Sequence, residues 1–201
     1  MKLAAAFLDA FQNQKKYGIG CYTASKLVMT HGILDYYSRV SPNPKILAEI
    51  EKRLWRDGDP IVDVEPGIMW SFEEGFPPED AKIPGKVLTI QYGVAPKNFV
   101  PGDWTYFYNT DRWSHAVTGY EGSNSIYLGR DKFDDFYNDN NHSFTYDEKL
   151  DEVFQWGNGV FTRPRDNELI QIIKPEELQQ LGQPPQRGGY LQDFRVYPDT
   201  F

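Results

Sequence analysis

The order of helical and strand-like patterns constrains the fold of this chain most. Three segments with helical spacing of apolar residues come first, and four short strand-like segments follow. The helical segments are 3–13, 21–37 and 44–55, and the strand-like segments are 87–92, 104–108, 115–120 and 125–128. Helices that precede the strands, instead of alternating with them, indicate segregated layers. We therefore predict an α+β fold with N-terminal helices packed on an antiparallel β-sheet.

The remaining segments add connections and a C-terminal part. Residues 60–86 are rich in proline, glycine and acidic residues, which predicts a long loop. Residues 168–173 are strand-like, 175–181 predict a short helix, and 190–197 predict a last strand. At 201 residues the chain is long enough to bury a substantial core. We predict a single domain over residues 1–201.

Composition excludes several classes of protein. The single cysteine excludes an intrachain disulfide framework and a zinc site made of several cysteines. A net charge of −8 argues against nucleic acid or an anionic membrane as the main partner. The acidic segment 131–148 lacks the glycine and glutamate positions of a helix–loop–helix calcium site, so we expect a solvated loop and no metal. We expect no cofactor.

The first residues also resemble the start of a signal peptide. Asp9 and the polar residues 12–16 end the apolar run too early for one, so we interpret the segment as an amphipathic helix. No run approaches the ~20 apolar residues that span a bilayer. The expected location is the cytoplasm, or export without a cleavable signal peptide.

Cys21 is the strongest candidate for a reactive group. It follows Gly-Ile-Gly and begins a helical pattern. A helix N-terminus offers backbone N–H groups and the positive end of the helix dipole, and both stabilise a thiolate. The alternative is a small buried hydrophobic residue, because cysteine is among the most buried residue types.

A thiol nucleophile needs a base, and the chain has three histidines. His31 lies about 280° around the helix from Cys21, so the two side chains do not share a face. His142 lies in the polar loop, where exposure or an acidic neighbour accounts for it. His115 begins the alternating segment 115–120 and is the preferred base.

A hairpin model of this region suggests what orients the imidazole. If Gly122 and Ser123 form a two-residue turn, His115 lies opposite Arg130. A change of register by one residue would then bring the next residue, Asp131, alongside the imidazole. Asp131 is then the first choice for the group that holds His115, and a plain strand-end acid is the alternative. The lesser choices are Asn124, Asp134 and Asp135.

These motifs resemble the papain-like superfamily, in the branch that holds the NlpC-type cell-wall peptidases and the bacterial protein-glutamine γ-glutamyltransferases. The resemblance rests on Gly-Cys21 at a helix start, on residues 100–109 (Val-Pro-Gly-Asp-Trp-Thr-Tyr-Phe-Tyr-Asn) and on His-Ala-Val at 115–117. Residues 122–133 also resemble the transglutaminases. The resemblance covers about residues 18–136, the expected core, with residues 137–201 as its extension.

The two branches align differently here. The transglutaminase alignment of residues 122–129 puts the acidic catalytic position on Ser123 and leaves the later histidine missing. The peptidase alignment makes 115–120 the strand that carries the base. We prefer the second alignment because it keeps a Cys–His pair.

The resemblance implies acyl transfer on protein carboxamides through a thioester, as in a transglutaminase or a glutamine or asparagine deamidase. The partner would be a protein or peptide with an exposed Gln or Asn side chain, together with an amine or water as acceptor. The Cys21 N–H would hold the oxyanion, and the further oxyanion or substrate candidates are Gln14, Tyr22, Trp104 and Trp113. A cell-wall-type peptidase or amidase and a non-catalytic binding domain remain as alternatives.

Overall fold

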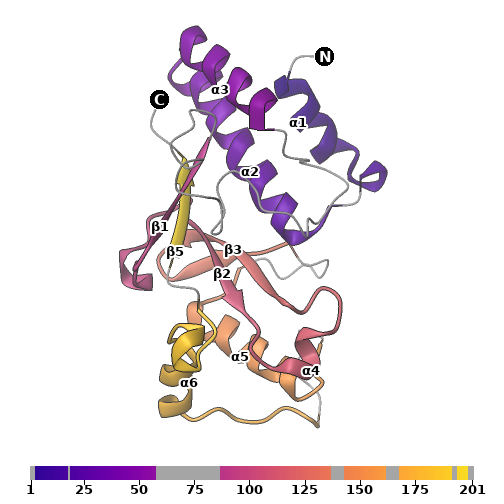
Figure 1. Ribbon diagram of the computed structural model, residues 1–201, viewed down its shortest axis with the longest axis vertical. Coiled ribbons are helices and arrows are strands. Elements are labelled where there is room, and N and C mark those ends of the chain that lie inside the picture. The colour runs from indigo at the N-terminus through magenta and orange to yellow at the C-terminus, as the bar shows by residue number, and fades with distance from the viewer. Residues whose placement is uncertain are drawn as a thin grey trace. The chain divides into compact units, whose positions relative to one another are not determined.

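The computed structural model describes residues 3–17, 19–57, 87–136, 143–161, 168–191 and 194–198 (Figure 1). The chain forms two compact units. The first contains Met1–Ile90 and Val196–Phe201, and the second contains Gln91–Arg195. The predicted loop at 60–86 and His142 lie outside the described residues, and the single-domain organisation stays a prediction.

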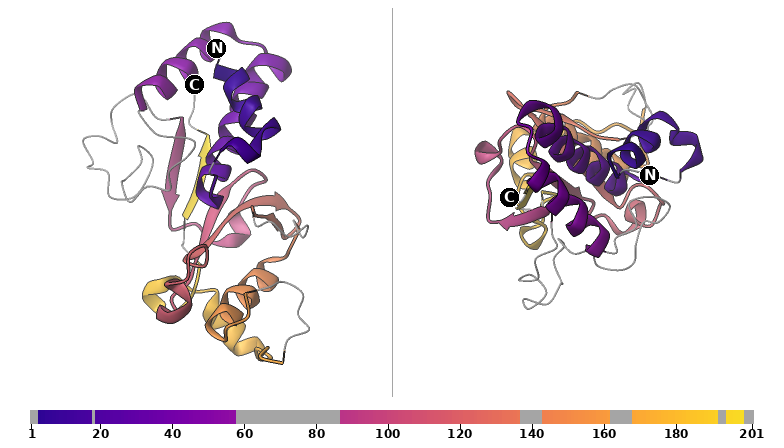
Figure 2. Two further views of the ribbon diagram at one scale, coloured as in Figure 1. Left: turned by 90° about the vertical axis from the view of Figure 1, so that its right-hand side faces the viewer. Right: turned by 90° about the horizontal axis from the view of Figure 1, so that it is seen from above.

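The first unit is mainly helical. Its helices are α1 (Leu3–Gln12), α2 (Cys21–Asp35) and α3 (Pro44–Asp57), with a 3-10 turn η1 (Gln14–Lys16) after α1 and a π-helical turn η2 (Tyr36–Val40) after α2. All three predicted helices are confirmed, with ends within two residues of the expected ones. The short connections bring α1 beside α2 and η2 beside α3 (Figures 1 and 2).

Apolar side chains hold these helices together. Phe7 of α1 and Leu27 and Ile33 of α2 are each at most 5% exposed, and Ile50 of α3 is fully buried. Burying one such side chain contributes roughly 1.5–3 kcal/mol. This packing holds α2 in place, and with it Cys21 at the first position of the helix.

A five-stranded sheet follows in the sequence. Its strands are β1 (Leu88–Tyr92), β2 (Trp104–Tyr108), β3 (Gly122–Gly129), β4 (Lys132–Asp134) and β5 (Phe194–Pro198), in the order β1-β5-β2-β3-β4. Strands β2, β3 and β4 pair in antiparallel fashion. The predicted α+β class is confirmed.

The strand order differs from the simple meander that the sequence suggested. The last strand, β5, lies between β1 and β2. The connection from β1 to β2 contains the 3-10 turn η4 (Pro96–Asn98) and is long enough to pass one strand position. A C-terminal strand therefore completes the sheet, and periodicity alone gives no indication of such a long-range pairing.

The second unit has an aromatic and aliphatic core beneath the sheet. Helix α5 (Tyr146–Gly157) contacts β2 and α6 (Pro175–Leu181). Phe107, Phe133, Leu150, Val153 and Trp156 are at most 1% exposed. Thr145 caps α5 by accepting a hydrogen bond from the Glu148 N–H, which is a sequence-readable start signal.

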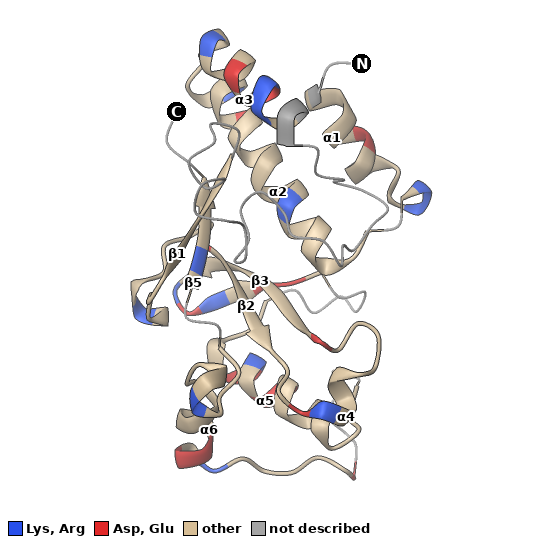
Figure 3. Ribbon diagram, in the orientation of Figure 1, with Lys and Arg blue, Asp and Glu red and all other residues tan. Residues whose placement is uncertain are grey.

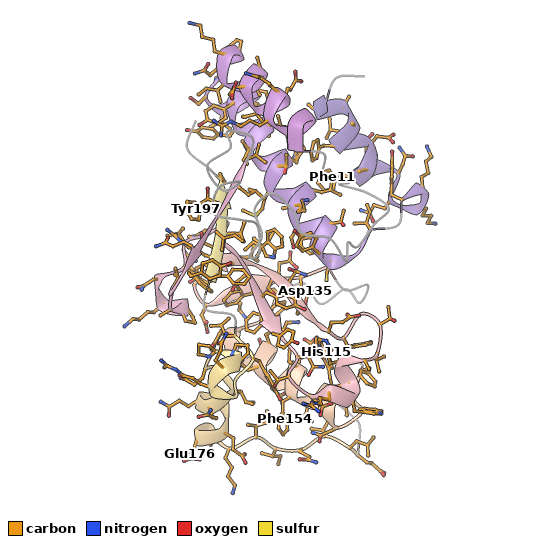
Figure 4. All side chains as sticks on the ribbon, viewed as in Figure 1. Phe11, His115, Asp135, Phe154, Glu176 and Tyr197 are labelled. Carbon is orange, nitrogen blue, oxygen red and sulfur yellow. The ribbon has the colours of Figure 1, made fainter. Side chains whose placement is uncertain are left out.

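A buried charged cluster lies inside this unit. Figure 3 shows other acidic and basic residues along the helices. Lys149 is fully buried and donates hydrogen bonds to Asp135 at 2.6 Å and to Glu152 at 3.0 Å. Its ammonium also lies 4.3 Å from the centroid of the Phe144 ring. The cluster connects β4 and α5, and Asp135 is labelled in Figure 4.

The described residues contain neither a membrane-spanning helix nor a cluster of metal-binding side chains. None of the helices seen in the described ranges has the length and apolar character needed to cross a membrane. In the same ranges, no group of three or more His, Cys, Asp or Glu side chains is arranged to hold a metal ion.

Candidate active site

Cys21 is the first residue of α2, as its sequence context predicts. The preceding Gly20 is the N-cap, in extended conformation (φ −83°, ψ 172°), and its carbonyl accepts the Ala24 N–H at 2.9 Å. The first N–H groups of a helix have no acceptor within the helix. The half-buried Cys21 thiol therefore stands at the positive end of a 15-residue helix, where a thiolate is stabilised over a thiol.

The residues after Cys21 fix the backbone at this point. The fully buried Ser25 donates a hydrogen bond from its hydroxyl to the Cys21 carbonyl at 3.0 Å. The half-buried Tyr22 is covered by Lys26, whose ammonium lies 5.6 Å from the centroid of the Tyr22 ring. Tyr22, which follows Cys21 in the sequence, thus contacts Lys26 one turn later in the same helix.

Two further residues of the first unit were candidates in the sequence. Gln14 is exposed on η1, and its backbone carbonyl accepts the Tyr17 N–H at 3.0 Å. His31 packs edge-on against Phe11 of α1, with ring centroids 5.3 Å apart; Phe11 is labelled in Figure 4. His31 therefore has a packing role between α1 and α2.

In the second unit the prediction of a strand at 115–120 is wrong. Residues Arg112–His115 form the short helix α4, and a turn follows before β3. Strand β3 pairs with β2, with Trp104 opposite Ile126 and Tyr108 opposite Gly122. The peptidase-type alignment, which needs a strand beginning at His115, therefore does not describe this chain, whereas residues 122–129 do form a strand.

Local polar side chains explain the change from strand to helix. Asp111 is the N-cap of α4, and its Oδ1 accepts both the Ser114 N–H and the Ser114 hydroxyl at 2.8 Å. Asn109 Oδ1 accepts the Asp111 N–H at 3.0 Å, which is an Asx turn two residues earlier. These side-chain bonds give the backbone an alternative to a sheet ladder.

The buried Asn109 is the centre of this network. Its Nδ2 donates to the Ser114 hydroxyl at 2.9 Å and to the Tyr120 carbonyl at 2.8 Å. The side chain is 1% exposed, so its hydrogen bonds fix both ends of the loop that carries α4. Sequence analysis missed Asn109 and Asp111, although the pattern Asn-Thr-Asp followed by Ser three residues later is a helix-start signal.

The same loop holds the His115 ring in place. His115 Nδ1 lies 3.0 Å from the Asn109 carbonyl oxygen, and the His115 N–H donates to the Asp111 carbonyl at 2.9 Å. The imidazole packs edge-on against Tyr108, with ring centroids 5.2 Å apart. His115 is labelled in Figure 4. A carbonyl oxygen only accepts, so Nδ1 carries the proton and Nε2 keeps its lone pair. The ring is half-buried.

Asp131 is in a different place from the one predicted. It lies with Arg130 in the turn between β3 and β4, both at positive φ, and its N–H donates to the Tyr127 hydroxyl at 3.3 Å. Gly122, at the other end of β3, pairs with Tyr108. The two ends of an eight-residue strand are about 23 Å apart. The predicted pairing of His115 with Arg130 is wrong, and the Asn109 carbonyl contacts the imidazole in place of Asp131.

The lesser candidates for this role have other surroundings. Asn124 Oδ1 accepts the Trp104 indole N–H at 2.9 Å inside the sheet. Asp135 pairs with Lys149 of α5, and Asp134 of β4 lies opposite Ile126 of β3. These three side chains belong to the packing of β3 and β4.

The two tryptophan candidates differ in exposure. Trp104 is 3% exposed and hydrogen-bonded to Asn124, so it is a core residue. Trp113 on α4 is 60% exposed and lies against Phe161, with ring centroids 5.9 Å apart. Of the two, only Trp113 presents an open aromatic surface, and it does so two residues before His115.

Ser123 occupies the position where the transglutaminase alignment expects an acid. It is fully buried in β3 opposite Phe107, and its hydroxyl lies 3.4 Å from the Ser125 hydroxyl. The neighbouring Gly122 is required by packing, because a Cβ there would collide with the Tyr106 hydroxyl and the Phe107 carbonyl. The strand is therefore present without a carboxylate at this position.

Comparison with known proteins gives one family and one structure. The family model described as protein-glutamine gamma-glutamyltransferase matches residues 68–141, a segment that contains β1, β2, α4, β3 and β4 and begins after Cys21. A transglutaminase from Geobacillus stearothermophilus, without its C-terminal extension, has a similar fold, with a TM-score of 0.52 and 18% sequence identity. That similarity covers 98% of this chain and 67% of the other. No protein of curated function matches the sequence. The chain resembles bacterial transglutaminases.

Proposed function

We propose that this chain catalyses cysteine-dependent acyl transfer on glutamine or asparagine carboxamides of proteins. The observation that carries the proposal is the match of residues 68–141 to the protein-glutamine γ-glutamyltransferase family. Cys21 at the first position of α2 supplies the nucleophile, and His115 supplies the base.

The reaction proceeds through a thioester. The Cys21 thiolate attacks the carboxamide carbon, the carbon–nitrogen bond breaks, and His115 gives its proton to the departing ammonia. An amine or a water molecule then attacks the thioester carbon, the carbon–sulfur bond breaks, and His115 takes the proton of the acceptor, so that the Cys21 thiolate and the protonated imidazole are restored. An amine acceptor gives a crosslinked product, and water gives a deamidated one.

The fixed tautomer of His115 supports its role as the base. The Asn109 carbonyl accepts the Nδ1 proton, so Nε2 is the atom that takes the proton of the thiol. In Ser-His-Asp and related sites a third group orients the base in the same way. Here a backbone carbonyl has that function, and its position depends on the side chains of Asn109 and Asp111.

The oxyanion of each tetrahedral intermediate needs hydrogen-bond donors. The backbone N–H of Cys21 at the start of α2 is the first donor of the proposal. The Gln14 amide is the second, and Tyr22 and the exposed Trp113 contact the substrate. Trp104 is omitted because it is buried in the core.

The test uses one protein substrate and two readouts. Casein and a fluorescent primary amine report crosslinking by amine incorporation, and ammonia release without the amine reports deamidation. We expect ammonia release from the unmodified chain and none from Cys21→Ala. Val28→Ala is the matched control, because it changes an exposed side chain of the same helix without removing the thiol.

Two other outcomes are informative. Release of new peptide α-amino groups, with no ammonia, would favour the peptidase alternative. Ser123, which stands where the transglutaminase alignment has an acid, favours a non-catalytic binding domain. A chain that gives neither ammonia nor peptide fragments, and whose Cys21 reacts with iodoacetamide with a pKa near the ordinary ~8.5, would contradict the proposed activity.

A further inference from the structure

A lysine, an aspartate and a glutamate meet inside the second unit, and the proposed acyl transfer uses none of them. Lys149 is 0% exposed, Asp135 2% and Glu152 8%. The Lys149 ammonium lies 2.6 Å from Asp135 Oδ2 and 3.0 Å from Glu152 Oε2. Lysine and acidic residues are almost never fully buried unless they are paired. An amine and two carboxyl groups are therefore in contact at a site shielded from water.

Ordered backbone and aromatic side chains hold the lysine and the aspartate in place. Asp135 directly follows β4, and Lys149 is the fourth residue of α5; Asp135 is labelled in Figure 4. The Phe144 ring is 3% exposed, and its centroid lies 4.3 Å from Lys149 Nζ. Phe133 stacks on Phe144, with ring centroids 6.1 Å apart. The amine and the carboxyl group thus meet in a packed apolar surrounding.

A buried ion pair is a costly use of these groups. The loss of hydration of two buried charges often exceeds the attraction between them. Here one ammonium faces two carboxylates, so the ionised cluster also carries an excess negative charge. Transfer of one proton from Lys149 Nζ to the Asp135 carboxylate removes two of the three charges. It leaves a neutral amine beside a neutral carboxylic acid, which are the reactants of amide formation.

We propose that Lys149 and Asp135 condense to an intramolecular isopeptide bond, with Glu152 as the proton carrier. The Asp135 Cγ atom is one C–O bond of about 1.2 Å beyond Oδ2, so it lies at most about 3.8 Å from the Lys149 nitrogen. Reacting atoms that are held about 3–3.5 Å apart behave as if their concentration were very high. The χ2 torsion of aspartate is soft, so a small rotation presents the face of the carboxyl group to the nitrogen.

The reaction releases one water molecule and needs no other reagent. The lone pair of the neutral Lys149 nitrogen attacks Asp135 Cγ and forms the carbon–nitrogen bond. Glu152 takes a proton from that nitrogen and gives it to a hydroxyl oxygen on Cγ. The bond from Cγ to this oxygen breaks, and the oxygen leaves as water. An ammonium and a carboxylate thus become a secondary amide and water, with no change of oxidation state and no net proton.

An exposed ion pair of the same unit provides a comparison. The ammonium of Lys132 and the carboxylate of Glu148 lie 4.0 Å apart, and their side chains are 45% and 63% exposed. Water solvates both charges, so we expect this pair to stay ionic. The bond between Asp135 and Lys149 would also close a covalent loop over residues 135–149, which restricts the unfolded chain as a disulfide does.

Peptide mapping of the unmodified chain tests the bond directly. Trypsin cleaves after charged lysine, so an amide at Lys149 blocks cleavage there. We expect a peptide of residues 133–165 with the mass of its sequence less one water, and no sequence ions from single backbone breaks within 135–149. A 133–149 peptide of full sequence mass would overturn the proposal. A 133–149 peptide that has lost water would also overturn it, because that product is a cyclised aspartate with a free lysine.

Three variants test the parts of the site by the intact mass of the chain. Lys149→Met removes the nucleophile, so the mass should equal that of the sequence; a loss of water that persists would contradict the assignment. Glu152→Gln should lower the crosslinked fraction more than tenfold, and a complete crosslink would contradict its role as proton carrier. Lys132→Met, in the exposed pair, is the control and should leave the crosslink complete. The digest of the unmodified chain decides the proposal even if a buried variant does not fold.

Discussion

The start of α2 and the loop that carries α4 position the two side chains of the proposed reaction in different ways. Cys21 depends on the backbone of one long helix, whose dipole and N–H groups act on whatever residue stands first. His115 sits on a helix of only four residues, and side-chain hydrogen bonds from Asn109 and Asp111 hold that helix in place. The first arrangement is robust to changes in neighbouring side chains, and the second depends on them.

Loss of Cys21 should have the largest effect on the proposed reaction. Cys21→Ala removes the nucleophile, so we expect turnover of a glutamine substrate to fall by about 10³-fold or more. The far-UV circular dichroism should stay the same, because a half-buried thiol contributes little to packing. Residual turnover above about a tenth of the original rate would show that another residue is the nucleophile.

Loss of the imidazole tests the second region. His115→Gln should lower kcat by about 10²–10⁴-fold, because general acid and base catalysis contribute that much. His31→Gln is the matched control, since His31 packs against Phe11. Steady-state rates for both variants check the expectation; equal losses in the two would indicate a structural effect and not catalysis.

Loss of the Asn109 side chain should have an intermediate effect. The start of α2 has no comparable side-chain network to remove. Asn109→Ala removes three hydrogen bonds of a buried side chain, at a cost of about 1–3 kcal/mol in the free energy of unfolding. We also expect kcat to fall about tenfold, because the backbone carbonyl of residue 109 is no longer held in place to accept the His115 Nδ1 proton. Urea unfolding and the pH–rate profile measure the two effects, and Asn98→Ala on the exposed turn η4 is the control. A stability loss with an unchanged pH–rate profile would contradict the positioning role.

The smallest expected effect concerns acid stability. Hydrogen bonds from the backbone N–H and the hydroxyl of Ser114 hold the pKa of Asp111 below its ordinary value of 3.8. A carboxylate with a lowered pKa stabilises the folded state above 3.8, and this contribution is lost as the pH falls through the folded pKa. Asp111→Ala should therefore cost about 1 kcal/mol at neutral pH and less in acid. Thermal unfolding at several pH values measures this; a difference that is independent of pH would contradict it.

The start of α2 and the α4 loop also differ in how far their structure could be predicted from the sequence. The helix at Cys21 was predictable because a glycine turn followed by helical spacing is a local signal. The segment 115–120 was not, because alternation over six residues is a weaker signal than an N-cap and an Asx turn. The signal was present in Asn109, Asp111 and Ser114, three residues that precede the segment that we interpreted as a strand.

Long-range contacts were the other gap. The place of β5 between β1 and β2 and the hydrogen bonds between Gln155 and Gln171 join residues that are distant in the chain, and no local pattern encodes them. Residues 168–173, which were predicted as strand-like, belong to none of the five strands of the sheet. The distance between Asp131 and His115 follows from the pairing of β3 with β2, whereas the predicted hairpin paired the strand that follows Ser123 with residues 115–120. The start of α2 was thus predictable from the local sequence, and the pairing of distant segments was not.

The most direct test of the proposed chemistry is the intact mass of the chain after acid quenching during turnover of a glutamine-containing peptide. We predict an adduct on Cys21 with the mass of the peptide less one ammonia, lost on treatment with hydroxylamine, which cleaves a thioester. Cys21→Ala should show no adduct. Ammonia release without any adduct on Cys21, or an adduct that persists in Cys21→Ala, would contradict the assignment of Cys21 as the nucleophile.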